Sequence, residues 1–338
     1  MTAVVQDRYG PAPEGLLRIG RIAVPPIGDA EVLVRVHAAS VDRGTWHVMA
    51  GLPYPVRLAG FGLRRPKYLN PGRSLAGTVE AVGPGVTGFA PGDQVYGTCN
   101  GSFAEYVTVA VDRLAAKPAN LTHEQAAAVP ISGVTALQGL RDRGRVRTGQ
   151  KVLIVGASGG VGTFAVQLAK AFGAEVTGVC STSKVDLVRS LGADHVIDHT
   201  TGDVADGQRF DVVLDTGGHR SLRRLRRTLT RRGTLVIVGS ETGGRWLGGF
   251  DRTIRAMLLS PLVRQRLAPL ASSENAADLV VLTGLVESGR VTPVIDRTYP
   301  LEEATAAIRH LLDGRARGKL VVSVSPGRTQ TPATGSTP

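Results

Sequence analysis

The sequence predicts an α/β protein in which a small, irregular β-barrel domain is followed by a parallel, doubly wound sheet. Two observations carry this prediction. Residues 1–118 are rich in glycine, proline and short β-type runs, with turn signals such as Pro84-Gly85 and Asn100-Gly101 between them. From about Leu121 onward, strand-like runs alternate with helical patterns, which is typical of a parallel sheet with helices on its faces.

The expected elements follow in chain order. The barrel strands are Val32–His37, Gly77–Val82, Gln94–Tyr96 and Phe103–Val109. The strands of the parallel sheet are Val152–Val155, Val176–Val179, His195–Ile197, Val212–Asp215, Leu235–Val238 and, more weakly, Arg266–Leu270.

The last part of the chain is expected to return to the barrel. A strand over Val294–Tyr299, a helix over Leu301–Leu312 and a strand over Lys319–Val324 would do so. The expected division is therefore residues 1–118 and 291–325 for the first domain and 119–290 for the second. Residues 326–338, rich in Thr, Pro and Gly, are expected to form a disordered tail.

A glycine-rich turn follows the first strand of the expected parallel sheet. The apolar run Val152–Val155 is typical of a strand buried on both faces, and a helix is expected over Val161–Phe172. Between them lies an A-x-G-x-x-G pattern, and a second strand run begins about 20 residues later, as a βαβ unit requires. Glycines allow close backbone approach, and the helix N-terminus attracts an anion. We therefore predict a seat for a dinucleotide pyrophosphate, built by Ser158, Gly159, Gly160, Val161 and Gly162.

The formal net charge of +12 raises the question of nucleic-acid binding. Much of the charge lies in an arginine-rich segment, Arg220–Arg232, that is expected to be a helix with Leu222, Leu225 and Leu229 facing inward. No aromatic residues alternate with these arginines to stack on bases, so a solvated helix face is favoured over a nucleic-acid patch. Positive potential also suits an anionic cofactor or substrate.

The sequence shows neither a membrane span nor a signal peptide. Its apolar runs fall well short of the ~18–20 residues that a span needs, and the N-terminus lacks a basic-then-apolar pattern. We expect a cytoplasmic protein without a membrane partner. The two cysteines, Cys99 and Cys180, lie in different expected domains and are expected to be reduced thiols.

Several motifs occur in a fixed order and spacing over residues 1–325. They are Gly77–Gly83, Pro91–Tyr96, Gly101–Tyr106, Gly133–Ala136, the glycine turn, Gly192–Asp198 and Gly318–Val322. Together they resemble the medium-chain dehydrogenase/reductase superfamily, specifically its zinc-independent quinone oxidoreductase branch. The resemblance implies a GroES-like barrel plus a Rossmann domain, an active site in the cleft between them, and a homodimer.

The resemblance also bears on zinc. Zinc-dependent relatives place Cys, His and Cys around the catalytic metal, and the matching positions here are Asp42, Arg73 and Ile131. A guanidinium and an alkyl side chain cannot coordinate zinc, and one carboxylate cannot hold it alone. The four-cysteine lobe that binds a structural zinc is also missing, because only Cys99 falls near it. We therefore expect no metal.

The end of the second strand of the parallel sheet indicates the cofactor. NAD sites usually carry an acidic residue there, which bonds the ribose 2′-hydroxyl. Here the strand ends in Cys180-Ser-Thr-Ser-Lys184, whose hydroxyls and ammonium favour a 2′-phosphate. We predict NADPH, with Ser181 and Lys184 at that phosphate, although Ser181–Ser183 can also cap a helix. The other expected cofactor contacts, partly from the resemblance, are Arg43, Thr135, Asp215, Gly239, Ser240 and Lys319.

Without zinc, hydrogen bonds must polarise the substrate carbonyl, so hydride addition to a conjugated acceptor becomes the natural reaction. The expected activity is NADPH-dependent reduction of quinones or α,β-unsaturated carbonyl compounds. By resemblance, Tyr54 occupies the loop of a catalytic tyrosine in 2-enoyl thioester reductases and is the leading proton donor. His47 matches the proton-relay histidine of zinc alcohol dehydrogenases. Without a metal alkoxide to relay from, a wall or hydrogen-bonding role is favoured for it over a relay. Asp42 replaces the asparagine usual in this branch and is expected to accept from a cofactor hydroxyl or from Arg43.

Two alternatives to this activity stay open. One is a 2-enoyl thioester (acyl-CoA) reductase, and the other is a catalytically idle NADPH-binding protein that acts through interaction or RNA binding. Two segments are candidate specificity elements: the basic, aromatic loop Leu58–Asn70 and the amphipathic stretch Arg245–Arg266. The second could serve equally as a substrate lid or as a helix against a partner subunit.

Overall fold

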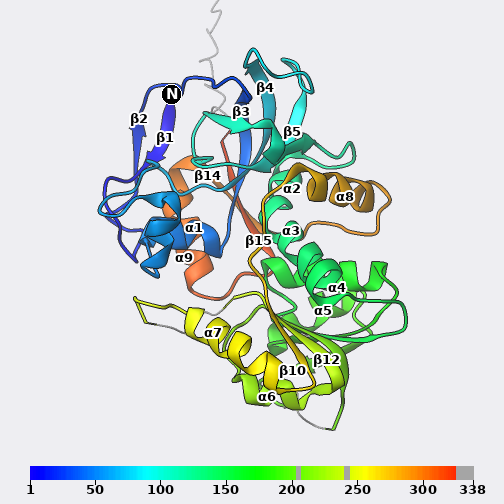
Figure 1. Ribbon diagram of the computed structural model, residues 1–338. Helices are drawn as coiled ribbons and strands as arrows, with labels where there is room; N and C mark the ends of the chain where they lie inside the picture. Colours follow the sequence, from blue (N-terminus) through cyan, green and yellow to red (C-terminus); the bar gives the residue numbers. More distant parts are fainter. Residues whose placement is uncertain (203–206, 240–243, 325–338) are drawn as a thin grey trace, which may run out of the picture.

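The structure is a computed structural model of the 338-residue chain and describes residues 1–202, 207–239 and 244–324. Two sheets organise it: a mostly antiparallel sheet with β3, β4 and β5 at the top of Figure 1, and a parallel sheet with β10 and β12 at the bottom. The tail, residues 326–338, lies outside the described residues. Among the described helices, none is both long and apolar enough to cross a bilayer.

The long strand β3 (Glu31–Val41) is the centre of the barrel sheet. One edge pairs antiparallel with β4 (Ser74–Val82), and the other pairs with β6 (Tyr106–Ala110) and then β15 (Lys319–Ser323). The C-terminal strand thus lies in the sheet formed by the N-terminal part of the chain. The remaining strands of this part are β1 (Thr2–Val5), β2 (Arg18–Arg21), β5 (Gln94–Thr98), β7 (Leu114–Ala116) and β14 (Ile295–Pro300).

The second sheet has the strand order β10-β9-β8-β11-β12-β13, with every neighbouring pair parallel. Its strands are β8 (Lys151–Val155), β9 (Glu175–Cys180), β10 (His195–Asp198), β11 (Phe210–Asp215), β12 (Leu229–Ile237) and β13 (Arg266–Pro269). The order reverses direction at β8, and in such sheets ligands bind beyond the carboxyl ends of the strands. The predicted doubly wound architecture is confirmed.

Helices cover both faces of this parallel sheet. Val152 and Ile154 of β8 face one apolar core together with α3 (Pro130–Gln138) and α4 (Gly160–Ala171). Leu153 and Val155 face the other core, with α6 (Leu222–Arg227) and α7 (Phe250–Leu259). The uninterrupted apolar run of β8 follows from this burial on two sides. The other helices are α1 (Arg43–Ala50), α2 (His123–Ala127), α5 (Val185–Ser190), α8 (Ala276–Glu287) and α9 (Ala304–Leu312).

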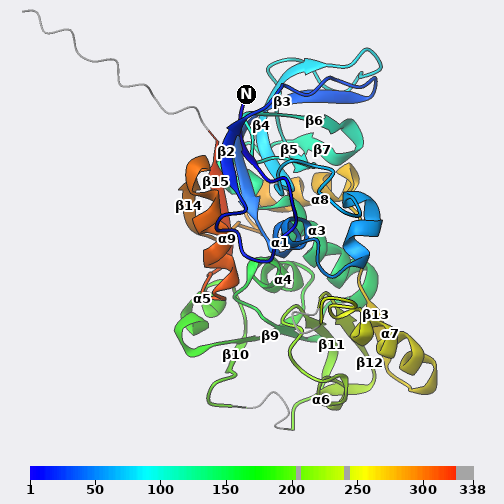
Figure 2. The same cartoon turned by 90° about the vertical axis from the view of Figure 1, so that its left-hand side faces the viewer.

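One sequence-based assignment needs correction. The arginine-rich helix ends at Arg227, and Leu229 is buried as the first residue of β12, where it pairs with Phe210. The leucine spacing that predicted one long helix therefore spans a helix and a strand. The amphipathic stretch Arg245–Arg266 contains a helix, α7, which a short helical turn follows. Arg266 opens β13, in the place of the expected strand. Figure 2 shows α7 at the lower right, beside β13.

A pair of histidines lies between the barrel sheet and α2. The rings of His37, on β3, and His123, at the start of α2, have centroids 4.4 Å apart. Nε2 of His123 is buried without a hydrogen-bond partner in the described residues. Burial lowers the pKa of both imidazoles, that of His123 to about 4. The positive charge of Arg35 lowers the pKa of His37 further, and that of Lys117 lowers the pKa of His123. The negative charge of Glu124 opposes both shifts.

This pair predicts a loss of stability in mild acid. Since the folded state lowers both pKa values, the neutral rings stabilise it fully only above the unfolded value of about 6.5. The free energy of unfolding should fall as the pH drops from there toward 4. Urea unfolding of the wild type and of His123→Gln at pH 7.5 and pH 5 measures this, and the variant should lose less stability. The exposed His195→Gln should behave like the wild type; an equal loss in all three proteins would contradict the assignment.

Candidate active site

Two adjoining hollows lie where the barrel sheet meets the carboxyl end of the parallel sheet. The first, of about 370 Å³, runs along the glycine turn, and the second, of about 440 Å³, opens beside it between α1, α3 and the segment before α7. They form one continuous cleft, because some residues line both hollows. The shared residues are Asp42, Arg43, Ser132, Val161, Thr216 and His219.

The glycine turn forms the floor of the first hollow, as predicted for a pyrophosphate seat. Gly156 makes the sharp turn with a φ of 83°, and Gly159 precedes α4 as its N-cap. A Cβ on Gly162 would lie 2.1 Å from the carbonyl oxygen of Gly156, so only glycine lets the helix approach the strand here. Of the predicted residues, Ser158, Gly159, Gly160 and Val161 line the hollow, and Gly162 supports the turn beneath them.

The start of β15 is attached directly to this turn. The amide of Gly318 donates to the carbonyl of Ser158 at 2.9 Å, and Gly318 forms a bridge with Gly159. Gly318 has a φ of 93°, and a Cβ there would meet the carbonyl oxygen of Val294 at 2.6 Å. The contact therefore requires glycine, and it holds the next residue, Lys319, in the cleft wall.

Lys319 is a fully buried lysine, 1% exposed, in the wall of the first hollow. Its Nζ donates to Oγ of Ser132 at 3.1 Å and lies 3.7 Å from Oδ2 of Asp42. Burial lowers the pKa of the Lys319 ammonium, and the Asp42 carboxylate opposes that shift. Asp42 also caps α1 through Oδ1, which accepts from the amide of Thr45. The structure thus brings Asp42 and Lys319 together in a buried charge pair.

The second hollow contains several other predicted residues. Arg43, His47, Thr135 and Gly239 all line it. Nδ1 of His47 donates to the carbonyl of Leu52 at 2.6 Å, which fixes the orientation of the ring. Oγ1 of Thr135 donates to Oγ of Ser272 at 3.3 Å. Ser240 lies outside the described residues.

Tyr54 is placed differently from the predicted proton donor. It is half-buried and is not among the residues that line either hollow. Its ring packs edge-on against Trp246 with centroids 5.1 Å apart, and the guanidinium of Arg57 lies 4.8 Å from the ring centre. The amide of Tyr54 donates to the carbonyl of Arg245, which does line the cleft. Tyr54 therefore supports the rim of the cleft.

The expected 2′-phosphate site is only partly assembled from the predicted residues. Lys184 lines the first hollow, and its Nζ donates to the carbonyls of Ala316 and Gly314 at 2.8 and 3.3 Å. Burial lowers the pKa of this ammonium. Ser181 precedes the short helical turn Thr182–Lys184 and does not line the hollow. His199, which the sequence analysis did not single out, does line it.

Asp215 is held inside the protein. Its side chain is fully buried and ion-paired with Arg252 of α7, and it accepts from the amide of Gly218. It does not line either hollow, so the structure places it as the anchor of α7 on the end of β11. Its neighbour Thr216 faces both hollows instead.

The positions that match zinc ligands are occupied by other interactions. Asp42 caps α1 and faces Lys319, and Ile131 lines the second hollow. Arg73 donates to Glu274 at 2.5 Å and lies 5.0 Å from the ring centre of Phe61. Within residues 1–202, 207–239 and 244–324, no group of three or more His, Cys, Asp or Glu side chains could hold a metal ion.

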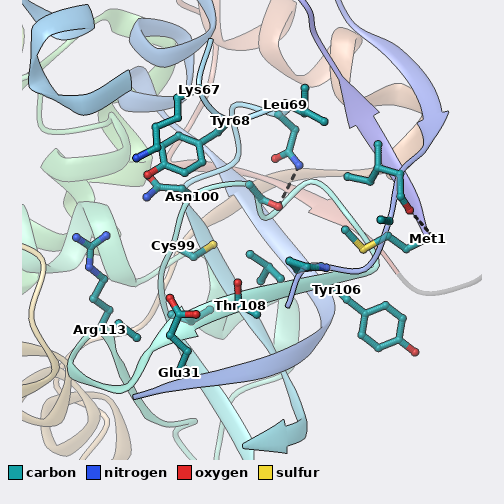
Figure 3. A pocket seen from close by; sticks show the side chains of 18 of the residues that line it. Met1, Glu31, Lys67, Tyr68, Leu69, Cys99, Asn100, Tyr106, Thr108 and Arg113 are labelled. Carbon is teal, nitrogen blue, oxygen red and sulfur yellow. Dashed lines mark hydrogen bonds between the residues drawn. The ribbon is translucent and has the colours of Figure 1, made fainter. Parts of the chain in front are cut away.

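A further hollow of about 580 Å³ lies on the barrel, away from the glycine turn (Figure 3). The end of the Leu58–Asn70 loop lines it, together with β6 and Cys99. None of the residues 58–70 lines the cleft, so the structure does not show this loop as part of the substrate site. Burial raises the pKa of the Cys99 thiol to about 12, so it is no nucleophile at neutral pH.

Comparisons with known proteins agree with this architecture. Residues 28–119 match the model of the alcohol dehydrogenase GroES-like domain, and residues 191–322 match that of a zinc-binding dehydrogenase. A mouse protein named NAD(P)H oxidoreductase RTN4IP1, mitochondrial, is 34% identical over 361 residues, which cover 96% of this chain and 89% of the mouse protein. An Arabidopsis thaliana chloroplast envelope quinone oxidoreductase homolog is 32% identical, with 95% and 98% covered.

A tomato (Solanum lycopersicum) 2-methylene-furan-3-one reductase is 33% identical, covering 90% of this chain and 74% of its own length. The solved structure of Escherichia coli quinone oxidoreductase complexed with NADPH superposes with a TM-score of 0.79 at 25% identity, covering 96% of this chain and all of that one. Such a barrel and parallel sheet around a dinucleotide seat define a nicotinamide-dependent oxidoreductase. The chain belongs to the medium-chain dehydrogenase/reductase superfamily, in its quinone oxidoreductase-like branch.

Proposed function

We propose that this protein is an NADPH-dependent, zinc-independent reductase of quinones or α,β-unsaturated carbonyl compounds. The observation that carries the proposal is the continuous cleft, in which a pyrophosphate seat opens into a second hollow lined by hydrogen-bonding side chains. Relatives named as quinone oxidoreductases and a furanone reductase support this substrate class. Lys184 in the first hollow supports NADPH over NADH, since an ammonium there favours a 2′-phosphate. His199, which lines the same hollow, offers a ring N–H as a further hydrogen-bond donor.

The bound cofactor would supply a hydride, and the chain would supply the donors that stabilise the acceptor. Hydride addition to a conjugated carbonyl leaves negative charge on the carbonyl oxygen, which hydrogen-bond donors in a dry cleft stabilise. Arg43 would be such a donor in the second hollow. His47 and Thr135 line the same hollow, where Nδ1 of His47 donates to Leu52 and Oγ1 of Thr135 donates to Ser272. Lys319 and Ser132 would orient Asp42, which faces both hollows. No step in this scheme needs a metal.

The residues at the zinc-matching positions support metal-independent chemistry. Arg73 brings a positive charge into the place of a histidine ligand and is neutralised by Glu274. Ile131 offers no lone pair. Asp42 would be the sole ligand, and its carboxylate is already shared between a helix cap and Lys319.

We also propose a homodimer, in which α7 and the turn before it form part of the contact. This segment exposes large apolar side chains while it buries Arg252 and Ala256, the reverse of an ordinary surface helix. Exposed apolar patches of this kind mark interaction sites. The exposed residues are Trp246, Leu247, Phe250, Ile254, Met257, Leu258 and Leu262. A cytoplasmic location stays a prediction.

Steady-state assays at 340 nm test the proposed activity. We expect NADPH oxidation with 9,10-phenanthrenequinone or an aliphatic enone, slower turnover with NADH, and no effect of a metal chelator. The reason is that the donors in the cleft, rather than a metal, would activate the acceptor. A quinone or enone acceptor should exceed a saturated aldehyde in kcat/KM.

Other outcomes of the same assay would contradict the proposal. Faster turnover of crotonyl-CoA than of the quinone and enone would favour a 2-enoyl thioester reductase. Turnover of the aldehyde alone, abolished by chelator, would overturn metal independence. NADPH binding without turnover of any acceptor would favour a binding protein, which a salt-dependent RNA-binding measurement would then examine.

A pair of substitutions distinguishes the two candidate proton donors. His47 lines the cleft and Tyr54 does not, so His47→Gln should lower kcat/KM at least about tenfold, within the range for a lost acid–base group. Tyr54→Phe keeps the ring that packs on Trp246 and should change kcat/KM by less than about threefold. Equal melting temperatures would show that both variants fold. The opposite ranking would restore Tyr54 as the donor.

A further inference from the structure

A third hollow, of about 490 Å³, lies behind the wall of the cleft and is lined mainly by charged and polar side chains. It is formed where the helical turn Gly139–Gly144, which continues α3, meets β13 and the segment that precedes α8. Nothing in the proposed reaction uses it. Its charged and polar lining residues are Gln138, Arg141, Asp142, Arg143, Arg145, Arg266, Ser273, Asn275 and Asp278.

The two carboxylates in this hollow already have hydrogen-bond partners. Arg141 donates to Asp142 at 2.6 and 2.8 Å and to Asp278 at 2.7 Å. Asp278 also accepts from the side-chain amides of Gln138 and Asn275 at 2.6 and 3.0 Å. A single guanidinium therefore bonds to both carboxylates. Because four arginines and two aspartates line the hollow, its net formal charge is +2.

Three arginines share the hollow without an ion-pair partner among the described residues: Arg143, Arg145 and Arg266. Arg266 is half-buried and donates to the carbonyl of Arg143 at 2.9 Å, so its guanidinium is held at the end of the helical turn. Burial lowers the pKa of Arg266, and the positive charges of Arg145 and Arg143 lower it further. Bringing these like charges together costs free energy that a bound anion would recover.

Arg145 is also unusual in its backbone. Its φ of 52° is the one positive value at a non-glycine residue in the described chain. The left-handed conformation caps the helical turn, with the Arg145 amide donating to the carbonyl of Leu140. Glycine would adopt this conformation without strain, whereas an arginine is strained in it. The side chain at this position therefore brings a charge to the hollow that the turn itself does not require.

We propose that Arg143, Arg145 and Arg266 form a binding site for a phosphate-bearing anion, separate from the cofactor seat. Guanidinium groups bind phosphoryl oxygens through paired, charge-assisted hydrogen bonds, and three of them match a multiply charged phosphate better than a single carboxylate. The phosphate can belong to a free anion such as pyrophosphate or to the nucleotide part of coenzyme A.

The site shares a wall with the cleft. Gln138 in this hollow and Thr135 in the cleft are one turn apart on α3. The side-chain amide of Gln138 donates to the backbone carbonyl of Ser273 and accepts from the backbone amide of Ser273. The residue before it, Ser272, accepts from Thr135. An anion bound at the arginines thus lies behind the segment that positions Thr135.

Isothermal titration calorimetry tests the site, with one equivalent of NADP⁺ present to fill the cofactor seat. Inorganic pyrophosphate and, in a second arm, coenzyme A are titrated at 0.15 M salt into the wild type and the variants. Arg145→Gly removes the charge and suits the positive φ, so the fold should be retained. Arg145→Gly and Arg143→Gln should each weaken binding at least about tenfold. Arg147 is exposed and lies outside the hollow, so Arg147→Gln should leave binding unchanged.

Tighter binding of coenzyme A than of pyrophosphate would identify the phosphate as part of a carrier, and the reverse would identify a free anion. Absence of binding to the wild type up to 10 mM, or equal affinity in Arg145→Gly, Arg143→Gln and Arg147→Gln, would overturn the proposal. The measurement involves no turnover, so its failure would leave the proposed reductase activity unaffected.

Discussion

The contact between the glycine turn and the start of β15 is the interaction on which the cleft depends. β15 is the strand by which the C-terminal part of the chain joins the barrel sheet, and Gly318, the residue just before it, is hydrogen-bonded to the turn that follows β8. The two sheets are therefore fixed to each other at the dinucleotide seat itself. Gly318 makes this possible, because no side chain fits between it and Val294.

The charges in the cleft follow from that contact. Since β15 begins at the turn, Lys319 is buried between the barrel and α3, where its ammonium faces Asp42 and Ser132. A buried lysine without partners would be costly, and a carboxylate at position 42 offsets much of that cost. This gives a physical reason for an aspartate where the branch usually has asparagine. The second buried pair, Asp215 with Arg252, has a different role: it anchors α7, whose preceding turn closes the other side of the cleft.

The sequence predicted the features that depend on local pattern. The apolar run of β8, the glycine turn and the alternating elements of the parallel sheet all have short-range signatures, and the structure contains them. Leu229 was wrongly placed in a helix. The spacing of the leucines continues the helical pattern past Thr228, although the helix ends there. Features that depend on tertiary packing could not be predicted, such as the contacts of Tyr54 with Trp246 and of Asp215 with Arg252. His199 lines the first hollow because it follows β10, whose place in the sheet is set by tertiary packing. The junction did have one sequence signal: a glycine opens the motif Gly318–Val322, and glycine at such a position is typical of a backbone with positive φ.

The most direct test of this account is the affinity for NADPH when the junction alone is disturbed. Fluorescence titration of NADPH into the wild type and Gly318→Ala would provide it, with Gly88→Ala, where an added Cβ meets open space, as the control. Binding should be at least about tenfold weaker in Gly318→Ala, because moving β15 displaces both the glycine turn and Lys319. The control should bind with wild-type affinity. Unchanged affinity in a folded Gly318→Ala variant would contradict the claim that this junction builds the cofactor site.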